Sequence, residues 1–158
     1  YAGCHHDIEA PIDETNHGTF FLNSALRHDD ILDGLSNTIF FGEYRGTGAP
    51  TLGWASGTRA TLRNTGLPPN SLAGPSPTLG FDESEPVDPD SPLSDPVPPA
   101  EIPPAVFYVG SFSSLHPGGA NFAFGDGSVR FVKNTVNVPL FRYLGHRADG
   151  EVLSDNSY

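Results

Sequence analysis

The clearest alternation of apolar and polar side chains lies in residues 120–134 (ANFAFGDGSVRFVKN), on both sides of an Asp-Gly pair. Phe122 and Phe124 fall on one face of the first run, and Val129 and Phe131 fall on one face of the second, because side chains alternate along a strand. Two alternating runs joined by an Asp-Gly turn are typical of a β-hairpin. The pattern therefore predicts two antiparallel strands.

Weaker patterns predict the rest of the fold. Runs of β-branched and aromatic residues predict strands over 18–25, 38–46 and 105–114, and a further short strand pair over 51–63. Residues 136–151 predict a short helix, because an apolar stripe at helical spacing follows a proline and ends near glycine. The expected class is α+β and mainly β, with an antiparallel sheet and one or two short helices.

The segment 64–104 interrupts this pattern. It holds 12 of the 16 prolines and seven acidic residues, and it contains no Lys or Arg. Proline removes backbone donors and blocks helices, so we expect a long acidic loop inserted into a single domain of residues 1–158. One interpretation is a surface excursion or linker. The other is an arm that docks a partner or bridges subunits, with contacts at Pro68, Pro86, Pro89, Pro98 and Pro99.

Charge and composition exclude several classes of protein. The 158 residues carry 8 Lys+Arg against 19 Asp+Glu, a formal net charge of −11, which argues against a partner made of nucleic acid. No apolar run approaches the roughly 20 residues that a membrane-spanning helix needs. The single cysteine excludes an internal disulfide.

Oxygen-bearing side chains gather in and after a turn-rich stretch, at Asp29, Asp30, Asp33, Asn37 and Glu43. Calcium binds six to eight oxygen atoms, so calcium is one hypothesis for this stretch, although the EF-hand spacing is absent. The same residue types also cap turns without any metal. No cofactor is certain from the sequence.

A second candidate metal site lies at the beginning of the chain. Side chains alternate along an extended chain, so His5 with Asp7, or Cys4 with His6, could share an ion. Imidazole and carboxylate ligands suit Zn, Cu or Ni. An ordinary polar loop is the other interpretation. The remaining histidines lack companions at ligand spacing, and we expect them at the surface or at caps: His17, His28 and His146.

The most specific spacing places His116 ahead of a Pro-Gly-Gly turn and nine residues before Asp126-Gly127. We expect Gly118 and Gly119 to turn the chain back, so that a hydrogen bond from His116 to Asp126 staples the hairpin. A catalytic dyad is the rival interpretation, but no motif supports a serine or cysteine nucleophile. We therefore expect that the chain is not an enzyme.

Four stretches carry a family resemblance: residues 1–13 (YAGCHHDIEAPID), 16–43 (ending in ILDGLSNTIFFGE), 110–132 (with the His-X9-Asp-Gly spacing) and 140–158. Together they resemble the C-terminal globular head of a large bacterial prepilin-like family of unknown function. That family carries the processing-associated H-X9-DG signature.

The resemblance implies an exported, pilin-like or pseudopilin-like protein at the cell surface or outside the cell. It implies a β-rich head that acts as a structural subunit through self-association. The N-terminal prepilin helix of such proteins is absent from this chain. Some pseudopilin heads are similar in using calcium, which strengthens the calcium hypothesis. The alternative function is a secreted or surface binding module for a metal, a sugar or a protein, without polymerisation.

Overall fold

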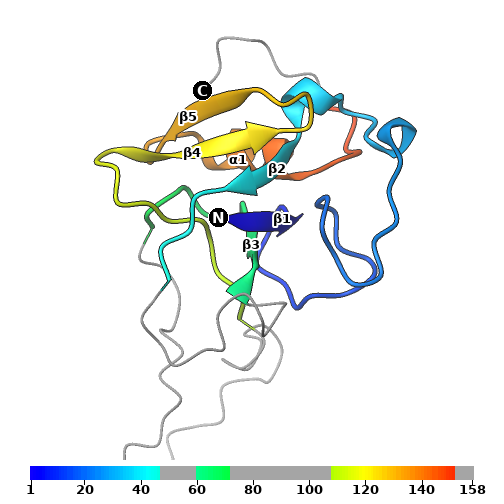
Figure 1. The fold of residues 1–158 in the computed structure, drawn as a ribbon, viewed down its shortest axis with the longest axis horizontal. Coiled ribbons are helices and arrows are strands. Elements are labelled where there is room, and N and C mark those ends of the chain that lie inside the picture. The colour runs from blue at the N-terminus through cyan, green and yellow to red at the C-terminus, as the bar shows by residue number, and fades with distance from the viewer. Residues whose placement is uncertain (47–59, 72–107, 152–158) are drawn as a thin grey trace, which may run out of the picture.

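The structure is a computed structural model that describes residues 1–46, 60–71 and 108–151 (Figure 1). These ranges form five strands, one α-helix and two short 3-10 helices. In chain order the elements are β1 (Ala2–His6), η1 (His28–Asp30), η2 (Leu35–Asn37), β2 (Ile39–Gly42), β3 (Leu62–Asn64), β4 (Gly119–Phe124), β5 (Val129–Lys133) and α1 (Val138–Gly145). No helix within these ranges has the length and apolar character that crossing a bilayer requires.

The five strands form one sheet in the order β3-β1-β2-β4-β5. The pairs β1–β2, β2–β4 and β4–β5 are antiparallel, whereas β1 and β3 run parallel. The expected α+β, mainly β class is confirmed, and the parallel pair makes the sheet mixed rather than wholly antiparallel. The first strand of the chain thus lies inside the sheet, between two strands that come later.

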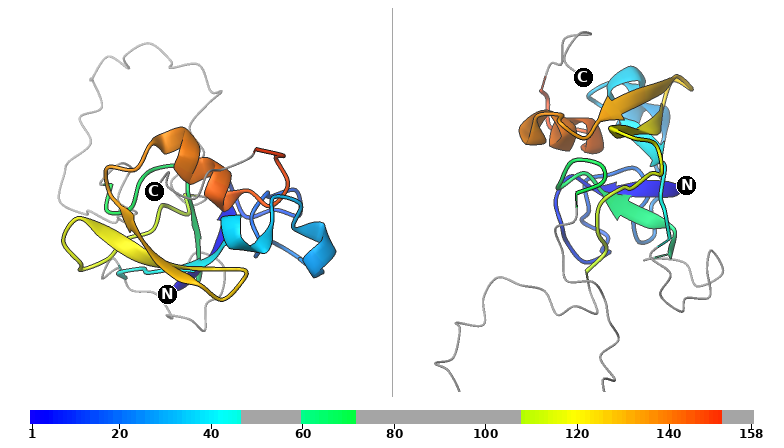
Figure 2. Two further views of the ribbon diagram at one scale, coloured as in Figure 1. Left: turned by 90° about the horizontal axis from the view of Figure 1, so that it is seen from above. Right: turned by 90° about the vertical axis from the view of Figure 1, so that its left-hand side faces the viewer.

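Helix α1 covers one face of the sheet and closes the core (Figure 2). Phe122 of β4 lies at the centre, with its ring 5.1 Å from that of Phe112 and 5.5 Å from that of Phe141 on the helix. Asn137 begins the helix by accepting a hydrogen bond from the Leu140 amide, as the residue that caps a helix N-terminus does. The helix is therefore fixed to the sheet by aromatic packing.

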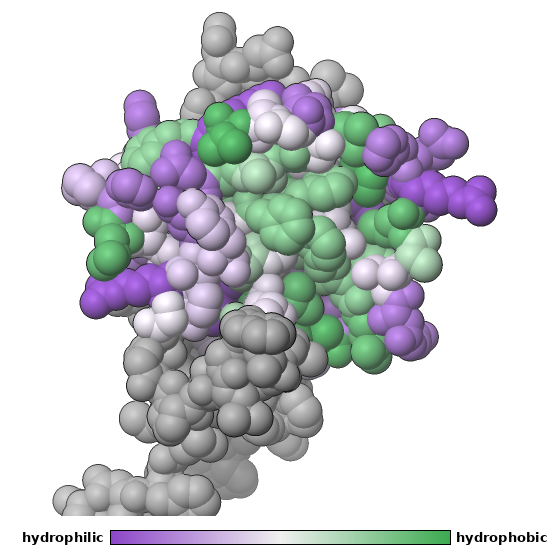
Figure 3. All heavy atoms as spheres, viewed as in Figure 1, coloured by the Kyte–Doolittle hydropathy of each residue, from purple (hydrophilic) through white to green (hydrophobic). Residues whose placement is uncertain are grey.

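The opposite face, here called the outer face, carries apolar side chains on β2, β4 and β5. A register shift between Ile39 and Phe41 turns Ile39 into the core and Phe41 outward, opposite Ala123. Ala123 in turn pairs with Val129, and Phe131 lies one pair further along β5. The exposed fractions are 42% for Phe41, 67% for Val129 and 44% for Phe131. Figure 3 shows hydrophobic side chains gathered at the centre of this face, with hydrophilic side chains to the left and right of them.

Several predicted elements are confirmed and one is wrong. The hairpin, the strand within 38–46 and the helix within 136–151 form as expected. The strand predicted over 18–25 does not form, because the amides of Gly18 and Thr19 bind the carbonyls of His5 and Cys4 in a turn around β1. Within 105–114, only the described residues can be compared, and Ser111 makes an isolated bridge there.

The first residues of the Pro-rich segment belong to the folded head. Asn64 ends β3, Thr65 is fully buried, and Asn70 donates its amide to the carbonyl of Phe112. The expected loop therefore begins later than residue 64. Of the proposed arm residues, Pro68 lies in this folded part, where its carbonyl accepts a hydrogen bond from Ser71. The other four lie outside the described residues: Pro86, Pro89, Pro98 and Pro99.

Candidate functional site: a histidine and aspartate cluster

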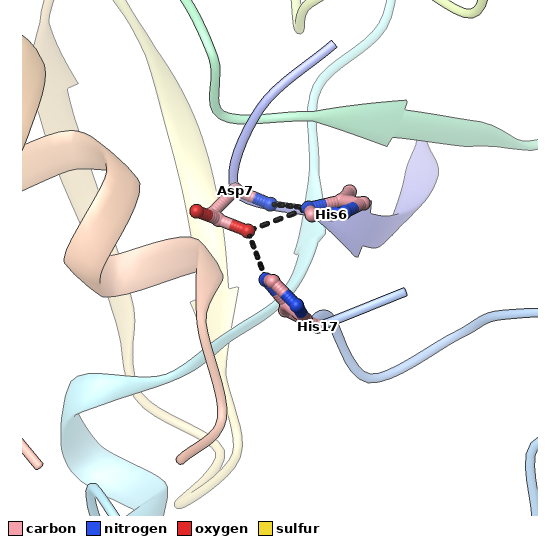
Figure 4. Close-up of side chains that lie close together, drawn as sticks. All are labelled: His6, Asp7 and His17. Atoms are coloured by element: carbon pink, nitrogen blue, oxygen red, sulfur yellow. Dashed lines mark hydrogen bonds and ion pairs between the residues drawn. The ribbon is translucent and has the colours of Figure 1, made fainter. Parts of the chain in front are cut away.

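Two imidazoles meet one carboxylate at the end of β1 (Figure 4). The Asp7 Oδ1 atom lies 2.5 Å from His6 Nδ1 and 2.8 Å from His17 Nδ1. The side chains of His6 and Asp7 are 8% and 19% exposed, whereas that of His17 is 45% exposed. The three residues form what we call the His6–Asp7–His17 cluster, which is reachable from solvent through His17.

Local backbone geometry explains why these residues meet. Strand β1 ends at His6, and the chain bends at Asp7, so its carboxylate folds back onto the preceding ring. His17 lies beside the Asp7 carboxylate because the next residue, Gly18, packs directly against β1. The Gly18 amide is 2.9 Å from the His5 carbonyl. A Cβ atom at Gly18 would lie 2.5 Å from the Cys4 oxygen, so only glycine permits this approach.

The carboxylate of the cluster is strongly held in its charged form. Burial alone would raise the pKa of Asp7, but hydrogen bonds from His6 and His17 lower it well below its usual range. His6 Nδ1 is also 2.9 Å from the backbone amide of Asp7, which points its proton at the ring nitrogen. That single nitrogen therefore faces both a fixed donor and a negatively charged acceptor.

A second group of ionisable side chains adjoins the first through close contacts between tilted imidazole rings. The ring of His17 lies 4.3 Å from that of His6 and 4.5 Å from that of His146, the residue that ends α1. Burial and the neighbouring His17 lower the pKa of His146. Asp33 and Asp149 lie beside it, and burial, with the charge of Asp33, raises the pKa of Asp149. Three imidazoles and three carboxylates thus share one region.

Asp33 has a structural task within this region. Its carboxylate accepts hydrogen bonds from the amides of Asp149 and Gly150, both at 2.8 Å. The turn after α1 is thereby fixed to the segment between η1 and η2. A pocket of about 290 Å³ opens next to it, lined in part by Asp7, Tyr143 and His146.

The structure does not bring together His5 and Asp7, the predicted pair. His5 is fully buried, and its Nδ1 is 3.2 Å from Asn16 Oδ1, while burial lowers its pKa to about 4. The alternation argument fails because the strand ends at His6, so Asp7 is no longer in extended register. Cys4 points into the core, where burial raises its pKa to about 12.

The five residues of the calcium hypothesis do not converge on one point. Asp30 accepts a hydrogen bond from the Arg27 amide at the start of η1, and Asn37 donates to the Asp33 carbonyl. Asp29 lies on η1 and is exposed. Glu43 accepts a hydrogen bond from the amide of Asn121 on β4, the strand that pairs with β2. Of these residues, Asp33 is the one that belongs to a described group with metal-ligand spacing.

The predicted hydrogen bond from His116 to Asp126 is wrong. His116 Nε2 instead lies 3.2 Å from Glu43 Oε1. Asp126 accepts from the amide of Ser128 and closes its own turn, while its own amide binds the Leu35 carbonyl. The two signature residues lie at opposite ends of β4, because six residues of extended chain separate the glycine turn from the hairpin tip.

The glycines of the signature are explained by the backbone. Gly118 and Gly127 have φ angles of +85° and +82°, in the left-handed region that favours glycine. A Cβ at Gly119 would lie 2.2 Å from the Val132 oxygen. These positions shape the hairpin, as expected, although the histidine pairs elsewhere.

Sequence reasoning missed His17 and His146 as members of the cluster. Neither has a ligand-spaced neighbour, and both come near His6 only through the tertiary fold. One signal was available. His17 precedes a glycine, and the sequence HRADG around His146 ends a predicted helix, so both lie where chains turn.

Comparison with known proteins assigns the chain to a family. No curated protein matches the sequence, and no solved structure matches the fold. A family model described as "Protein of unknown function (DUF1559)", SBP_bac_10, matches residues 1–138. This range includes both stretches that carry the strongest resemblance, 16–43 and 110–132. The chain belongs to the DUF1559 family.

Proposed function

We propose that this chain is an extracellular or cell-surface structural subunit of a pilin-like assembly, that it is not an enzyme, and that it acts by self-association. The observation that carries the proposal is the apolar outer face of the sheet. Phe41 lies on β2, and Val129 and Phe131 lie on β5, on the other side of β4. Their exposed fractions are between 42% and 67%. Contiguous apolar surface of this kind is typical of a protein interface.

The edge of the sheet supports the same proposal. Within the described residues, no strand pairs with the outer side of β5. An open edge presents backbone donors and acceptors to which another chain can add a strand. The edge strand carries Lys133, the one lysine of the chain, whereas segment 64–104 carries seven acids and no basic residue. An acidic arm of one copy would therefore be attracted to this edge of another.

The overall charge sets the conditions for assembly. Each copy carries a formal net charge of −11, so copies repel one another at low ionic strength. Salt at about 0.15 M reduces the Debye length to about 8 Å and removes most of that repulsion. Association through the outer face is therefore expected to strengthen as salt is added.

Sedimentation velocity over a concentration series, with negative-stain microscopy of the same samples, tests the proposal. The wild-type chain should form larger species at about 0.15 M salt and dissociate at about 0.01 M. Val129→Asp should abolish association, because it places a charge on the outer face. Leu32→Asp is the matched control, since Leu32 is 74% exposed in a turn that is not part of that face.

Two results would contradict the proposal. One is a wild-type chain that stays monomeric at every concentration and salt. The other is an assembly that Val129→Asp and Leu32→Asp disturb equally, since the outer face would then have no special part in it.

A further inference from the structure

We propose that the His6–Asp7–His17 cluster binds a divalent transition metal ion of the zinc class. The proposal is independent of self-association, because the cluster lies at the end of β1 and not among the outer-face residues. It rests on three ligand atoms of suitable chemistry, on their spacing, and on the close approach of a carboxylate oxygen to a ring nitrogen, whose mutual repulsion a cation removes.

The ligand atoms are two imidazole nitrogens and one carboxylate oxygen. This combination suits zinc, copper and nickel, whereas calcium prefers a shell made of oxygen alone. The three ligand atoms lie within 4.8 Å of one another. Bonds of about 2.0–2.1 Å in a tetrahedral zinc site place ligand atoms about 3.3 Å apart. The two contacts to Asp7 Oδ1, 2.5 and 2.8 Å, therefore need to lengthen by less than an ångström.

The environment of His6 Nδ1 is the second observation. The backbone N–H of Asp7 points at this nitrogen from 2.9 Å, which requires a lone pair there. Asp7 Oδ1 lies 2.5 Å from the same nitrogen, which requires a proton there. No protonation state of the ring satisfies both neighbours. When the ring nitrogen is unprotonated, its lone pair and the carboxylate oxygen repel each other, and a cation bound to both atoms removes this repulsion. The ion then takes the lone pair to which the Asp7 N–H points.

The loop that carries His17 is held in place, as a binding site requires. The guanidinium of Arg147 donates to the carbonyl of Asn16 at 2.6 Å and to that of Gly18 at 3.0 Å. The Arg147 amide also donates to the His17 carbonyl at 3.1 Å. Three hydrogen bonds from one residue thus fix the backbone on both sides of this ligand. Preorganised ligands of this kind lower the entropic cost of binding an ion.

The segment that ends α1 lies beside the cluster, where Asp7 and His146 line the same pocket. The ring of His146 is tilted against that of His17 at a centroid distance of 4.5 Å, so this imidazole or a water molecule is the nearest candidate for a fourth ligand. An ion at this point would connect the first strand of the chain to the end of its last helix. Metal binding is therefore expected to stabilise the whole head and not only one loop.

Isothermal titration calorimetry tests the site directly. The chain is stripped of metal with EDTA, dialysed, and titrated separately with zinc chloride and calcium chloride. We expect zinc to bind with a stoichiometry of one, and calcium to give no comparable heat. Zinc at about 100 times its dissociation constant should raise the melting temperature by about 5 °C or more.

Matched variants separate the cluster from other histidines. His17→Ala should weaken zinc binding by roughly 10- to 100-fold or more, since losing even a ligand's hydrogen-bond partner has effects of that size. His17 is nearly half exposed, so this variant should fold. His28→Ala is the control, because His28 is exposed on η1 and is not part of the cluster. X-ray absorption at the zinc edge should show one imidazole ligand fewer in His17→Ala than in the wild type.

Two outcomes would overturn the proposal. One is the absence of saturable zinc binding by the stripped wild-type chain. The other is equal zinc affinity in His17→Ala and His28→Ala, with unchanged imidazole scattering, which would place the ion elsewhere. Circular dichroism of both variants confirms that each comparison is made on folded protein.

Discussion

Glu43, the residue that follows β2, pairs with His116, with 3.2 Å between the carboxylate oxygen and the imidazole nitrogen. Glu43 ends the first long stretch of family resemblance, and His116 begins the H-X9-DG signature of the second. The same carboxylate accepts hydrogen bonds from the amide and the side chain of Asn121 on β4. One partly buried carboxylate therefore joins the two motifs, and it binds the backbone of β4 as well as the histidine.

Replacing Glu43 by glutamine should lower stability and change its pH dependence. Burial would raise the pKa of Glu43, but hydrogen bonds from Asn121 and Ser114 lower it below the usual 4.5. As pH falls, Glu43 therefore becomes protonated at a higher pH in the unfolded state than in the folded state. The stabilisation is present above about pH 4.5 and is lost as pH drops through the lowered pKa. Urea titrations from pH 7 to 3 should show that Glu43→Gln lowers the free energy of unfolding by about 1 kcal/mol at pH 7. Below about pH 4.5 the unfolding free energy of the variant should fall less steeply with pH than that of the wild type.

His116→Ala is the comparison for that experiment. The His116 side chain is 56% exposed, so its pair with Glu43 should contribute less than about 1 kcal/mol. A His116→Ala variant that loses more stability than Glu43→Gln would show that the histidine, and not the hydrogen bonds to Asn121, contributes most of the stability where the two motifs meet.

Removing the Asp33 carboxylate should release the turn after α1. The amides of Asp149 and Gly150 would lose their acceptor in Asp33→Ala. Hydrogen exchange followed by mass spectrometry should show faster exchange at residues 147–151, while peptides from the β4–β5 hairpin keep their protection. Asp29→Ala is the control, because Asp29 is exposed on η1. Unchanged exchange at 147–151 would mean that the rest of α1 suffices to hold the turn.

Cys4 should resist thiol reagents in the folded protein. It is fully buried in the core, and its sulfur lies 3.7 Å from the Gly145 carbonyl on α1. Reaction with Ellman's reagent should be negligible in buffer and complete in concentrated guanidinium, because only the unfolded chain exposes the thiol. Rapid labelling in buffer, with the circular dichroism spectrum intact, would contradict the packing of α1 onto β1.

Alanine at Gly145 should destabilise the head through steric overlap. A Cβ there would lie 1.9 Å from Thr65 Oγ1. Overpacking of this kind typically costs about 1–3 kcal/mol. Gly46→Ala is the control, because nothing lies within 4 Å of a Cβ at that position. In thermal unfolding, the double variant Gly145→Ala with Thr65→Ala should regain part of the melting temperature that Gly145→Ala loses. A melting temperature that is not regained would mean that the steric overlap is not with Thr65.

Local sequence signals predicted the elements that local interactions form. The Asp-Gly turn identifies β4 and β5 because both strands are adjacent in the chain, and Pro139 marks the first turn of α1. Strand β1 was missed because its five residues, AGCHH, are all buried and show no alternation. Both of its neighbours, β2 and β3, come from distant parts of the chain.

The candidate site was less predictable for the same reason. Asp7 was identified as a ligand, but its partners His6 and His17 depend on where β1 ends and on how Gly18 crosses it. The position of His146 depends on the packing of α1 against the sheet. The pairing of His116 with Glu43 likewise requires β2 and β4 to be neighbours, which no spacing within one motif can reveal.

The anchoring of residues 64–71 beside 108–114 has a consequence for engineering. The Asn64 amide binds the Gly110 carbonyl, and Asn70 binds both Phe112 and Ser114, so the two ends of the intervening segment are clamped together by the head itself. Closing a longer loop between fixed ends costs only about 0.6 kcal/mol for each doubling of its length. The head can therefore serve as a display scaffold, in which a foreign peptide or domain replaces the segment between residues 71 and 108 while the sheet stays intact.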